Sequence, residues 1–323
     1  MSEYAVVTEK LQRVFGENVA VLGVDLQVRQ GEIYGFLGPN GAGKSTVVRM
    51  LTTLLMPTSG TARVADRDVI KEPTEVRLRT GVALQDAALD PKQTGLELMR
   101  LQGRLYGLSG SDTARRIDEL EPLVDIGDAI KDQIGTYSGG MKRRLDLAAS
   151  LIHNPEVLFL DEPTTGLDPI SRVRVWDEVR RINRDLGITI FLTTQYLEEA
   201  DALVDRIGII TDGVLAVEGT PAALKMTVGT DVIMAKIDGD VENARRAIER
   251  IRSVESVDVY DKELSIRVMN GAGFISAVAL ALNEAAVSVR ELTLRTPTLD
   301  DVFLNVTGGR LQQDGVPEQA HVS

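Results

Sequence analysis

The sequence predicts an α/β fold, in which a large domain with a mainly parallel β-sheet is followed by a smaller α+β domain. Two observations predict this fold. Up to about residue 228, short apolar runs typical of strands alternate with longer helical patterns. Beyond residue 229, the runs follow the order β-α-β-β-α-β. We therefore expect a first domain at residues 1–228, a second at 229–307 and a flexible tail at 308–323.

The apolar runs of the first block are continuous rather than alternating, which is typical of parallel strands buried on both faces. Three runs have this character: Ile33–Leu37, Val157–Leu160 and Ile188–Thr193. Two more, Ile207–Ile210 and Val214–Val217, flank Asp212-Gly213, so we expect a hairpin there. Helical patterns occupy Lys44–Leu55 and Arg172–Asp185.

The second block reads as a split βαβ, or ferredoxin-like, arrangement. Its expected strands are Val232–Ile237, Val254–Tyr260, Glu263–Val268 and Val287–Leu294. Apolar residues recur at steps of three and four from Val241 to Ile251, which indicates a helix, and Phe274–Asn283 is also helical. The alternative is a lone strand–helix appendage.

Composition excludes several functional classes. The 323 residues include 36 basic and 48 acidic side chains, two His and no Cys, with a net charge of −12. The absence of Cys excludes a disulfide scaffold and a thiol nucleophile, and two His disfavour a multi-His metal site. The negative charge disfavours a protein that binds nucleic acid by neutralising phosphates. No apolar stretch approaches the ~18 residues of a membrane span, so we expect none.

The strongest motif is a Gly-rich loop between the first apolar strand and a helix. Its residues are Gly38, Pro39, Asn40, Gly41, Ala42, Gly43, Lys44, Ser45 and Thr46, which fit the P-loop pattern. Glycines let backbone N–H groups converge on phosphate oxygens at a helix N-terminus. We expect Lys44 to reach the β- and γ-phosphates of ATP, Ser45 to ligate Mg²⁺, and Thr46 to lie near the α-phosphate.

A second motif places two acids directly after a buried strand. Asp161 and Glu162 follow Val157–Leu160, at the carboxyl edge of the sheet where ligands bind in open α/β folds. We expect Asp161 to support Mg²⁺ and Glu162 to polarise the attacking water. Without the P-loop, a solvated acidic pair at a strand end would be the simpler interpretation.

Ser138, Gly139 and Gly140 precede another helical pattern and form a third motif. Together the three motifs resemble those of ATP-binding-cassette (ABC) ATPases, within the P-loop NTPase fold. The resemblance implies a parallel core sheet, an antiparallel β subdomain and a helical subdomain. It also implies that the Ser-Gly-Gly segment of one subunit closes over the γ-phosphate held by the P-loop of another.

Three further positions match family elements. Phe15 resembles the aromatic residue that stacks on adenine, although a core Phe is an alternative. Gln85 resembles the Q-loop glutamine, which reaches Mg²⁺ and responds to the transmembrane partner. Asp168 resembles the D-loop aspartate at the dimer interface, although it could simply cap the following helix.

One position departs from the family pattern. Where the family usually has a His that contacts the γ-phosphate, this chain has Gln195, and its two His, His153 and His321, lie elsewhere. Gln195 can donate an amide N–H to a phosphate oxygen but cannot carry a proton. The departure puts the rate of hydrolysis in question more than ATP binding.

The resemblance extends to Thr296–Leu304, which is similar to the ending of daunorubicin/doxorubicin-resistance ATPases. It implies an ATP-hydrolysing subunit that powers efflux through a separate transmembrane permease. Such a subunit would form a homodimer or cassette heterodimer when ATP is bound. It would be peripheral on the cytoplasmic face of the membrane and would have no nucleic-acid partner. Two alternatives are a soluble ABC ATPase acting on ribosomes or DNA, and an ATP sensor with little turnover.

Overall fold

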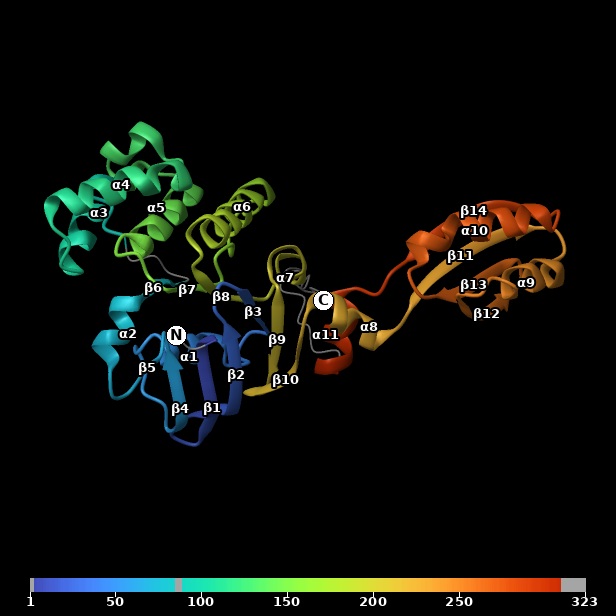
Figure 1. Cartoon of the computed structure of the whole chain (residues 1–323), viewed down its shortest axis with the longest axis horizontal. Coiled ribbons are helices and arrows are strands. Elements are labelled where there is room, and N and C mark those ends of the chain that lie inside the picture. The colour runs from blue at the N-terminus through green and yellow to red at the C-terminus, as the bar shows by residue number, and fades with distance from the viewer. Residues whose placement is uncertain (1–2, 85–88, 309–323) are drawn as a thin grey trace, which may run out of the picture. The chain divides into compact units, whose positions relative to one another are not determined.

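The computed structural model describes residues 3–84 and 89–308 (Figure 1). The described chain divides into two compact units, one ending at Pro221 and the other starting at Ala222. The expected boundary at residue 228 therefore lies slightly beyond this division, because most of helix α8 (Pro221–Val228) groups with the second unit.

A six-stranded sheet forms the centre of the first unit, in the order β10-β9-β3-β8-β7-β6. Its strands are β3 (Ile33–Leu37), β6 (Thr80–Ala83), β7 (Val157–Asp161), β8 (Thr189–Thr194), β9 (Arg206–Thr211) and β10 (Val214–Gly219). Neighbouring strands from β9 to β6 are parallel, and β3, β7 and β8 are buried throughout. The predicted parallel core is confirmed. Strand β10 returns antiparallel through the expected hairpin, with Asp212 and Gly213 both at positive φ.

A second, antiparallel sheet has the order β2-β1-β4-β5. Its strands are β1 (Tyr4–Phe15), β2 (Asn18–Arg29), β4 (Ser59–Val64) and β5 (Arg67–Asp68). Helix α1 (Lys44–Leu51) contacts β2 and β4 of this sheet and β7 of the parallel sheet. It buries Val47, Val48, Met50 and Leu51 in the core cluster that the two sheets share. This packing fixes the loop that precedes α1.

Helix α1 is shorter than predicted. The apolar pattern continues to Leu55, but the helix ends at Leu51. Thr53 has φ 62°, a left-handed conformation that cannot continue a right-handed helix. Local conformation therefore overrides the periodic pattern here.

The remaining helices of the first unit are α2 (Pro73–Arg79), α3 (Gly95–Leu105), α4 (Gly110–Val124), α5 (Gly139–Leu151), α6 (Pro169–Leu186) and α7 (Leu197–Leu203). Helices α3, α4 and α5 pack on one another, and Figure 1 shows them as a separate group of green ribbons. Short 3₁₀ turns at Gly127–Lys131 and Ile134–Thr136 connect α4 to α5. None of the helices in the described ranges combines the length and apolar character needed to cross a membrane.

The second unit contains a four-stranded antiparallel sheet in the order β12-β13-β11-β14. Its strands are β11 (Asp231–Asp238), β12 (Val254–Tyr260), β13 (Glu263–Val268) and β14 (Ser288–Arg295), and its helices are α9 (Val241–Glu249), α10 (Gly271–Glu284) and α11 (Leu299–Thr307). Strand β13 lies between β11 and β12, which is the split βαβ arrangement. The alternative of a lone strand–helix appendage is wrong, because the unit has its own core of Ile233, Ala235, Ile248, Leu264 and Ile266 among others.

Candidate active site

The Gly-rich loop connects the buried strand β3 to helix α1. Gly43, immediately before the helix, has φ 105°, and a Cβ there would lie 2.5 Å from the carbonyl oxygen of Ala20. A Cβ on Gly38 would collide with the carbonyl oxygen of Ile210. Larger residues at these two positions would displace the loop, so glycine is required there on packing grounds alone.

Lys44 is buried at the start of α1, with 4% of its surface exposed. Its Nζ donates to the carbonyl oxygens of Gly38 at 2.8 Å and Pro39 at 3.2 Å. The same Nζ lies 3.4 Å from Oε1 of Glu162. Burial lowers the pKa of the Lys44 ammonium, and the charge of Glu162 opposes that change. The ammonium group of Lys44 therefore contacts both the Gly-rich loop and Glu162, which follows strand β7.

Asp161 ends strand β7 and is 3% exposed. Its Oδ1 accepts hydrogen bonds from Ser45 Oγ at 3.2 Å and from Thr193 Oγ1 at 2.5 Å. Thr193 is its pairing partner on β8, so the register of the parallel strands sets this contact. The expected proximity of Ser45 and Asp161 is thus present. Together they offer hydroxyl and carboxylate oxygens, the donor type that Mg²⁺ prefers.

Glu162 adopts a backbone conformation that is rare for a non-glycine residue, with φ 48°. Its N–H donates to Thr193, 3.0 Å from the hydroxyl and 3.2 Å from the carbonyl oxygen. Its carboxylate accepts a hydrogen bond from Thr165 Oγ1 at 3.2 Å. Such conformations persist where neighbours enforce them, and they occur often at functional sites. Here the conformation aims Glu162 toward Lys44.

The Ser-Gly-Gly segment begins helix α5. Ser138 is exposed and caps the helix, accepting from Met141 N–H at 3.3 Å. A Cβ on Gly140 would lie 3.6 Å from Ser171 Oγ, and one on Gly139 would lie 3.9 Å from Leu167. Leu167 and Ser171 lie just before and within α6. The Nζ of Lys44, by contrast, contacts Gly38, Pro39 and Glu162, so the Ser-Gly-Gly segment and Lys44 have different neighbours. The exposed face of Ser138 and Gly139 is thus available to another molecule.

Two family models match the chain. One describes ABC transporters and covers residues 21–165; the other describes the C-terminal domain of DrrA1-3-like ATP-binding proteins and covers residues 219–307. The daunorubicin resistance ATP-binding protein DrrA3 of Streptomyces coeruleorubidus is 45% identical over 95% of this chain and 97% of that protein. The chain belongs to the ABC transporter family of ATP-binding proteins.

Other relatives extend the match. The doxorubicin resistance ATP-binding protein DrrA of Mycobacterium tuberculosis is 40% identical over 94% of each chain. The linearmycin resistance ATP-binding protein LnrL of Bacillus subtilis is 36% identical over 94% of this chain and 98% of that protein. A dimeric ATP-binding cassette solved with ADP and phosphate matches with TM-score 0.60 and 25% identity over 67% of this chain and 98% of that one. The chain is thus an ABC ATPase, an enzyme that hydrolyses ATP.

Asp168 caps helix α6 of the cassette. Its carboxylate accepts from the N–H of Ser171 at 3.0 Å and from the hydroxyl of Ser171 at 2.6 Å. These bonds lower the pKa of Asp168. Asp168 is exposed, so capping and contact with another molecule are compatible.

Phe15 ends strand β1 and is 44% exposed, with the Arg13 guanidinium 4.4 Å from its ring centroid. The alternative of a core Phe is therefore wrong. Gln195 is half-buried and directly follows β8. Gln85 lies outside the described residues, as do His321 and the tail from residue 309.

His153 is a structural residue. Its ring stacks on Tyr106 with centroids 3.6 Å apart, and its Nε2 lies 3.0 Å from the Thr80 carbonyl oxygen. Burial lowers the pKa of His153 to about 4. Thr80 begins the parallel strand β6, so His153 lies at the amino edge of the sheet, whereas the Gly-rich loop lies at the carboxyl edge.

Sequence reasoning missed several residues that support the site. They are Thr193, Thr165, Arg143 and Glu199. Arg143 on α5 donates to the Leu84 carbonyl oxygen at 2.7 Å, where β6 ends. No sequence signal could find these residues, because an isolated Thr, Arg or Glu has many common uses. Except for Thr165, which binds Glu162 three residues away, their partners are also distant in the chain.

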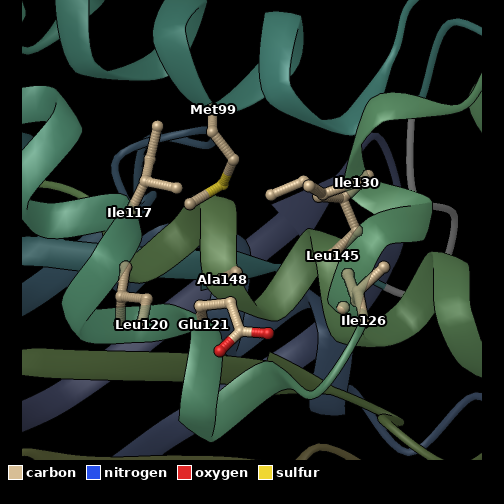
Figure 2. A pocket seen from close by; sticks show the side chains of 9 residues that line it. Met99, Ile117, Leu120, Glu121, Ile126, Ile130, Leu145 and Ala148 are labelled. Atoms are coloured by element: carbon tan, nitrogen blue, oxygen red, sulfur yellow. The ribbon is translucent and has the colours of Figure 1, made fainter.

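A separate apolar pocket lies among the helices of the green group (Figure 2). Met99, Ile117, Leu120 and Leu145 are among its lining residues, and Glu121 brings the one carboxylate. This lining offers no cation to a phosphate. The pocket is therefore distinct from the site around Lys44.

Proposed function

We propose that this ATPase powers the efflux of drug-like or lipophilic compounds through a separate transmembrane permease. The names of the relatives support this proposal, because resistance to daunorubicin, doxorubicin and linearmycin recurs among them. The observation that carries the ATPase chemistry is the meeting of Lys44 with Glu162 and of Ser45 with Asp161, where the start of α1 faces the end of β7. The permease supplies the pathway and the specificity.

Within the site, we assign the phosphates of ATP to Gly38–Thr46, with Lys44 neutralising charge on the β- and γ-phosphates. Ser45 and Asp161 fit a magnesium ion, which usually takes one or two protein oxygens and completes its shell with phosphate oxygens and water. Bound there, Mg²⁺ would neutralise charge on the phosphates. Gln85 is the third proposed ligand. Such a site does not require three His, Cys, Asp or Glu side chains, and the described ranges contain no group of three of these residues that could hold a metal ion.

The other roles complete the proposed mechanism. Glu162 accepts a hydrogen bond from the attacking water and orients it, and Gln195 donates its amide N–H to a γ-phosphate oxygen. Phe15 stacks on adenine through its exposed ring. Ser138, Gly139 and Gly140 of one copy bind the γ-phosphate held by a second copy, and Asp168 lies at the interface between them. A homodimer or cassette heterodimer therefore forms with ATP bound.

The location follows from the permease partner: the chain is peripheral on the cytoplasmic face of the membrane. Residues 1–228 form the nucleotide-binding domain in this proposal, and 229–307 form an accessory domain for dimer or permease contacts.

Reconstitution tests the proposal. The chain is combined with a membrane subunit encoded beside it in lipid vesicles, and ATP-dependent movement of daunorubicin is measured. We expect transport to require both proteins and to stop with Lys44→Ala, while the exposed-surface control Lys71→Ala leaves it intact. ATP hydrolysis without transport of any lipophilic compound would favour the soluble-ATPase alternative. ATP binding without turnover, even with the permease, would favour the sensor alternative.

A further inference from the structure

Glu199 is a fully buried carboxylate outside the phosphate-binding motifs. It lies on helix α7, and its exposed surface is 0%. Its Oε1 accepts two hydrogen bonds, from Thr164 Oγ1 at 3.0 Å and from Trp176 Nε1 at 2.9 Å. Burial raises the pKa of Glu199. Donors from two other segments therefore hold Oε1, whereas Oε2 has no hydrogen-bond partner among the described residues.

These donors come from the segments that carry the proposed catalytic groups. Thr164 lies two residues after Glu162, in the loop that leads to Asp168. Trp176 lies on α6, the helix that Asp168 caps. Glu199 itself lies on α7, which begins two residues after Gln195. One carboxylate therefore connects the loop after Glu162 and the helix after Asp168 to the helix that follows Gln195.

Packing alone does not explain a carboxylate at this position. Removing a carboxylate from water is costly, and a buried charge is often replaced by an apolar side chain without loss of stability. A Leu has a similar size and would avoid the cost of burying a charge. What an apolar side chain cannot supply is an acceptor for Thr164 and Trp176.

We propose that Glu199 is a positioning residue for ATP hydrolysis, which holds the loop from Glu162 to Asp168 in register with Gln195. It does so through its hydrogen bonds with Thr164 and Trp176 and through its place on α7, the helix that begins two residues after Gln195. The proposal rests on the proposed function, because it requires ATP at Lys44 and a water oriented by Glu162. A displacement of about 1 Å at a reacting group can reduce turnover about a hundredfold.

The chain carries its own spectroscopic probe for this contact. Trp176 is the one Trp among its 323 residues, and its indole N–H donates directly to Glu199. Intrinsic fluorescence of the full-length protein therefore reports whether the hydrogen bond is present. Three variants separate the two hydrogen bonds of Glu199. Glu199→Leu removes both bonds, and Glu199→Gln keeps an acceptor oxygen. Thr164→Val removes only the hydrogen bond from the loop after Glu162. Glu198→Gln is the matched control, because Glu198 is the exposed neighbour.

The experiment measures kcat and KM for ATP, Tm and Trp emission in each full-length variant. We expect Glu199→Leu and Thr164→Val to lower kcat about tenfold to a hundredfold with KM changed less than about threefold. Glu199→Leu should also shift Trp emission, and Glu199→Gln should recover most of kcat. Glu198→Gln should match the wild type in every measurement.

The outcomes separate this inference from the proposed function. Wild-type kcat in folded Thr164→Val or Glu199→Leu overturns the positioning role and leaves the ATPase assignment standing. The positioning role is also overturned if Glu199→Gln lowers kcat and Tm as much as Glu199→Leu does, so that the retained acceptor oxygen rescues neither. If Glu199→Leu fails to fold, Thr164→Val still decides the matter. A wild-type protein without ATP hydrolysis overturns both the proposed function and this inference.

Discussion

The Nζ atom of Lys44 lies 3.4 Å from a carboxylate oxygen of Glu162, and both side chains are almost fully buried, at 4% and 9% exposure. This pair joins the start of α1 to the end of β7. Their proposed tasks differ: Lys44 is assigned to phosphate binding and Glu162 to orienting the attacking water. The charge of Glu162 also keeps the pKa of Lys44 from falling further through burial.

Replacing Glu162 by Gln should separate these tasks. We expect kcat to fall about 10²- to 10⁴-fold, because the amide is a much weaker hydrogen-bond acceptor for the water than the carboxylate. ATP binding should persist, since Lys44 keeps its contacts with Gly38 and Pro39. Turnover and equilibrium binding of ATP provide the measurements, with Glu198→Gln as the surface control. Unchanged turnover would show that another group orients the water.

Replacing Gln195 by His tests whether the missing proton carrier limits the rate. A His at this position would restore the residue usual in the family, so we expect kcat to rise or stay within about threefold of the wild type. Gln195→Ala should lower it by about tenfold to a thousandfold, through loss of one aimed donor. Steady-state hydrolysis distinguishes these results. Equal rates in all three proteins would remove Gln195 from the mechanism.

Asp168 has two proposed roles, which two substitutions separate. Asp168→Ala removes the cap that accepts from Ser171, so it should lower the Tm. Asp168→Asn keeps a capping oxygen and should leave the Tm nearly unchanged. If Asp168 also acts at the dimer interface, Asp168→Asn should still reduce ATP-dependent dimerisation, measured by light scattering. Normal dimerisation of the Asn variant would reduce Asp168 to a helix cap.

His153 should make the protein less stable in acid. Its pKa is lowered to about 4 in the folded state from a usual value near 6.5, so the unfolded chain binds the proton more readily. Stability from this group is therefore present above about pH 6.5 and is lost as the pH falls toward 4. The loss reaches about 2–3 kcal/mol. Urea unfolding at several pH values gives the free energy of unfolding as a function of pH. This free energy should fall less steeply toward pH 4 in His153→Gln than in the wild type, whatever the stability of the variant at pH 7. An equally steep profile would contradict the prediction.

Glu178 should have the opposite dependence. Burial raises the pKa of Glu178 to about 8, although Arg144 lies 3.8 Å away and opposes the change. A raised folded-state pKa favours the folded protein below about pH 4.5, and the benefit is lost as the pH rises through 8. Glu178→Gln should therefore gain stability relative to the wild type between pH 5 and pH 8, by on the order of 1–2 kcal/mol after solvent screening. Thermal unfolding at these two pH values checks the sign.

Local patterns were enough to predict the parts of the site that lie within one segment. The loop Gly38–Thr46 must be Gly-rich and must join a strand to a helix, and both requirements are visible in consecutive residues. The two acids at the end of β7, Asp161 and Glu162, were predictable for the same reason. Strands β12 and β13 were predicted with their observed bounds, because β-rich runs ended at a clear turn.

Contacts between distant segments required the tertiary structure. Thr193 binds Asp161 because β7 and β8 pair in one register, and Thr164, Trp176 and Glu199 meet because α6 and α7 pack together. The antiparallel sheet of β1, β2, β4 and β5 was expected only through family resemblance, since its strands have mixed exposure and weak patterns. The sequence by itself determined which residues we propose to bind phosphate and to orient water. The pairing register and helix packing decided which other side chains hold them, because those contacts join residues that are far apart in the chain.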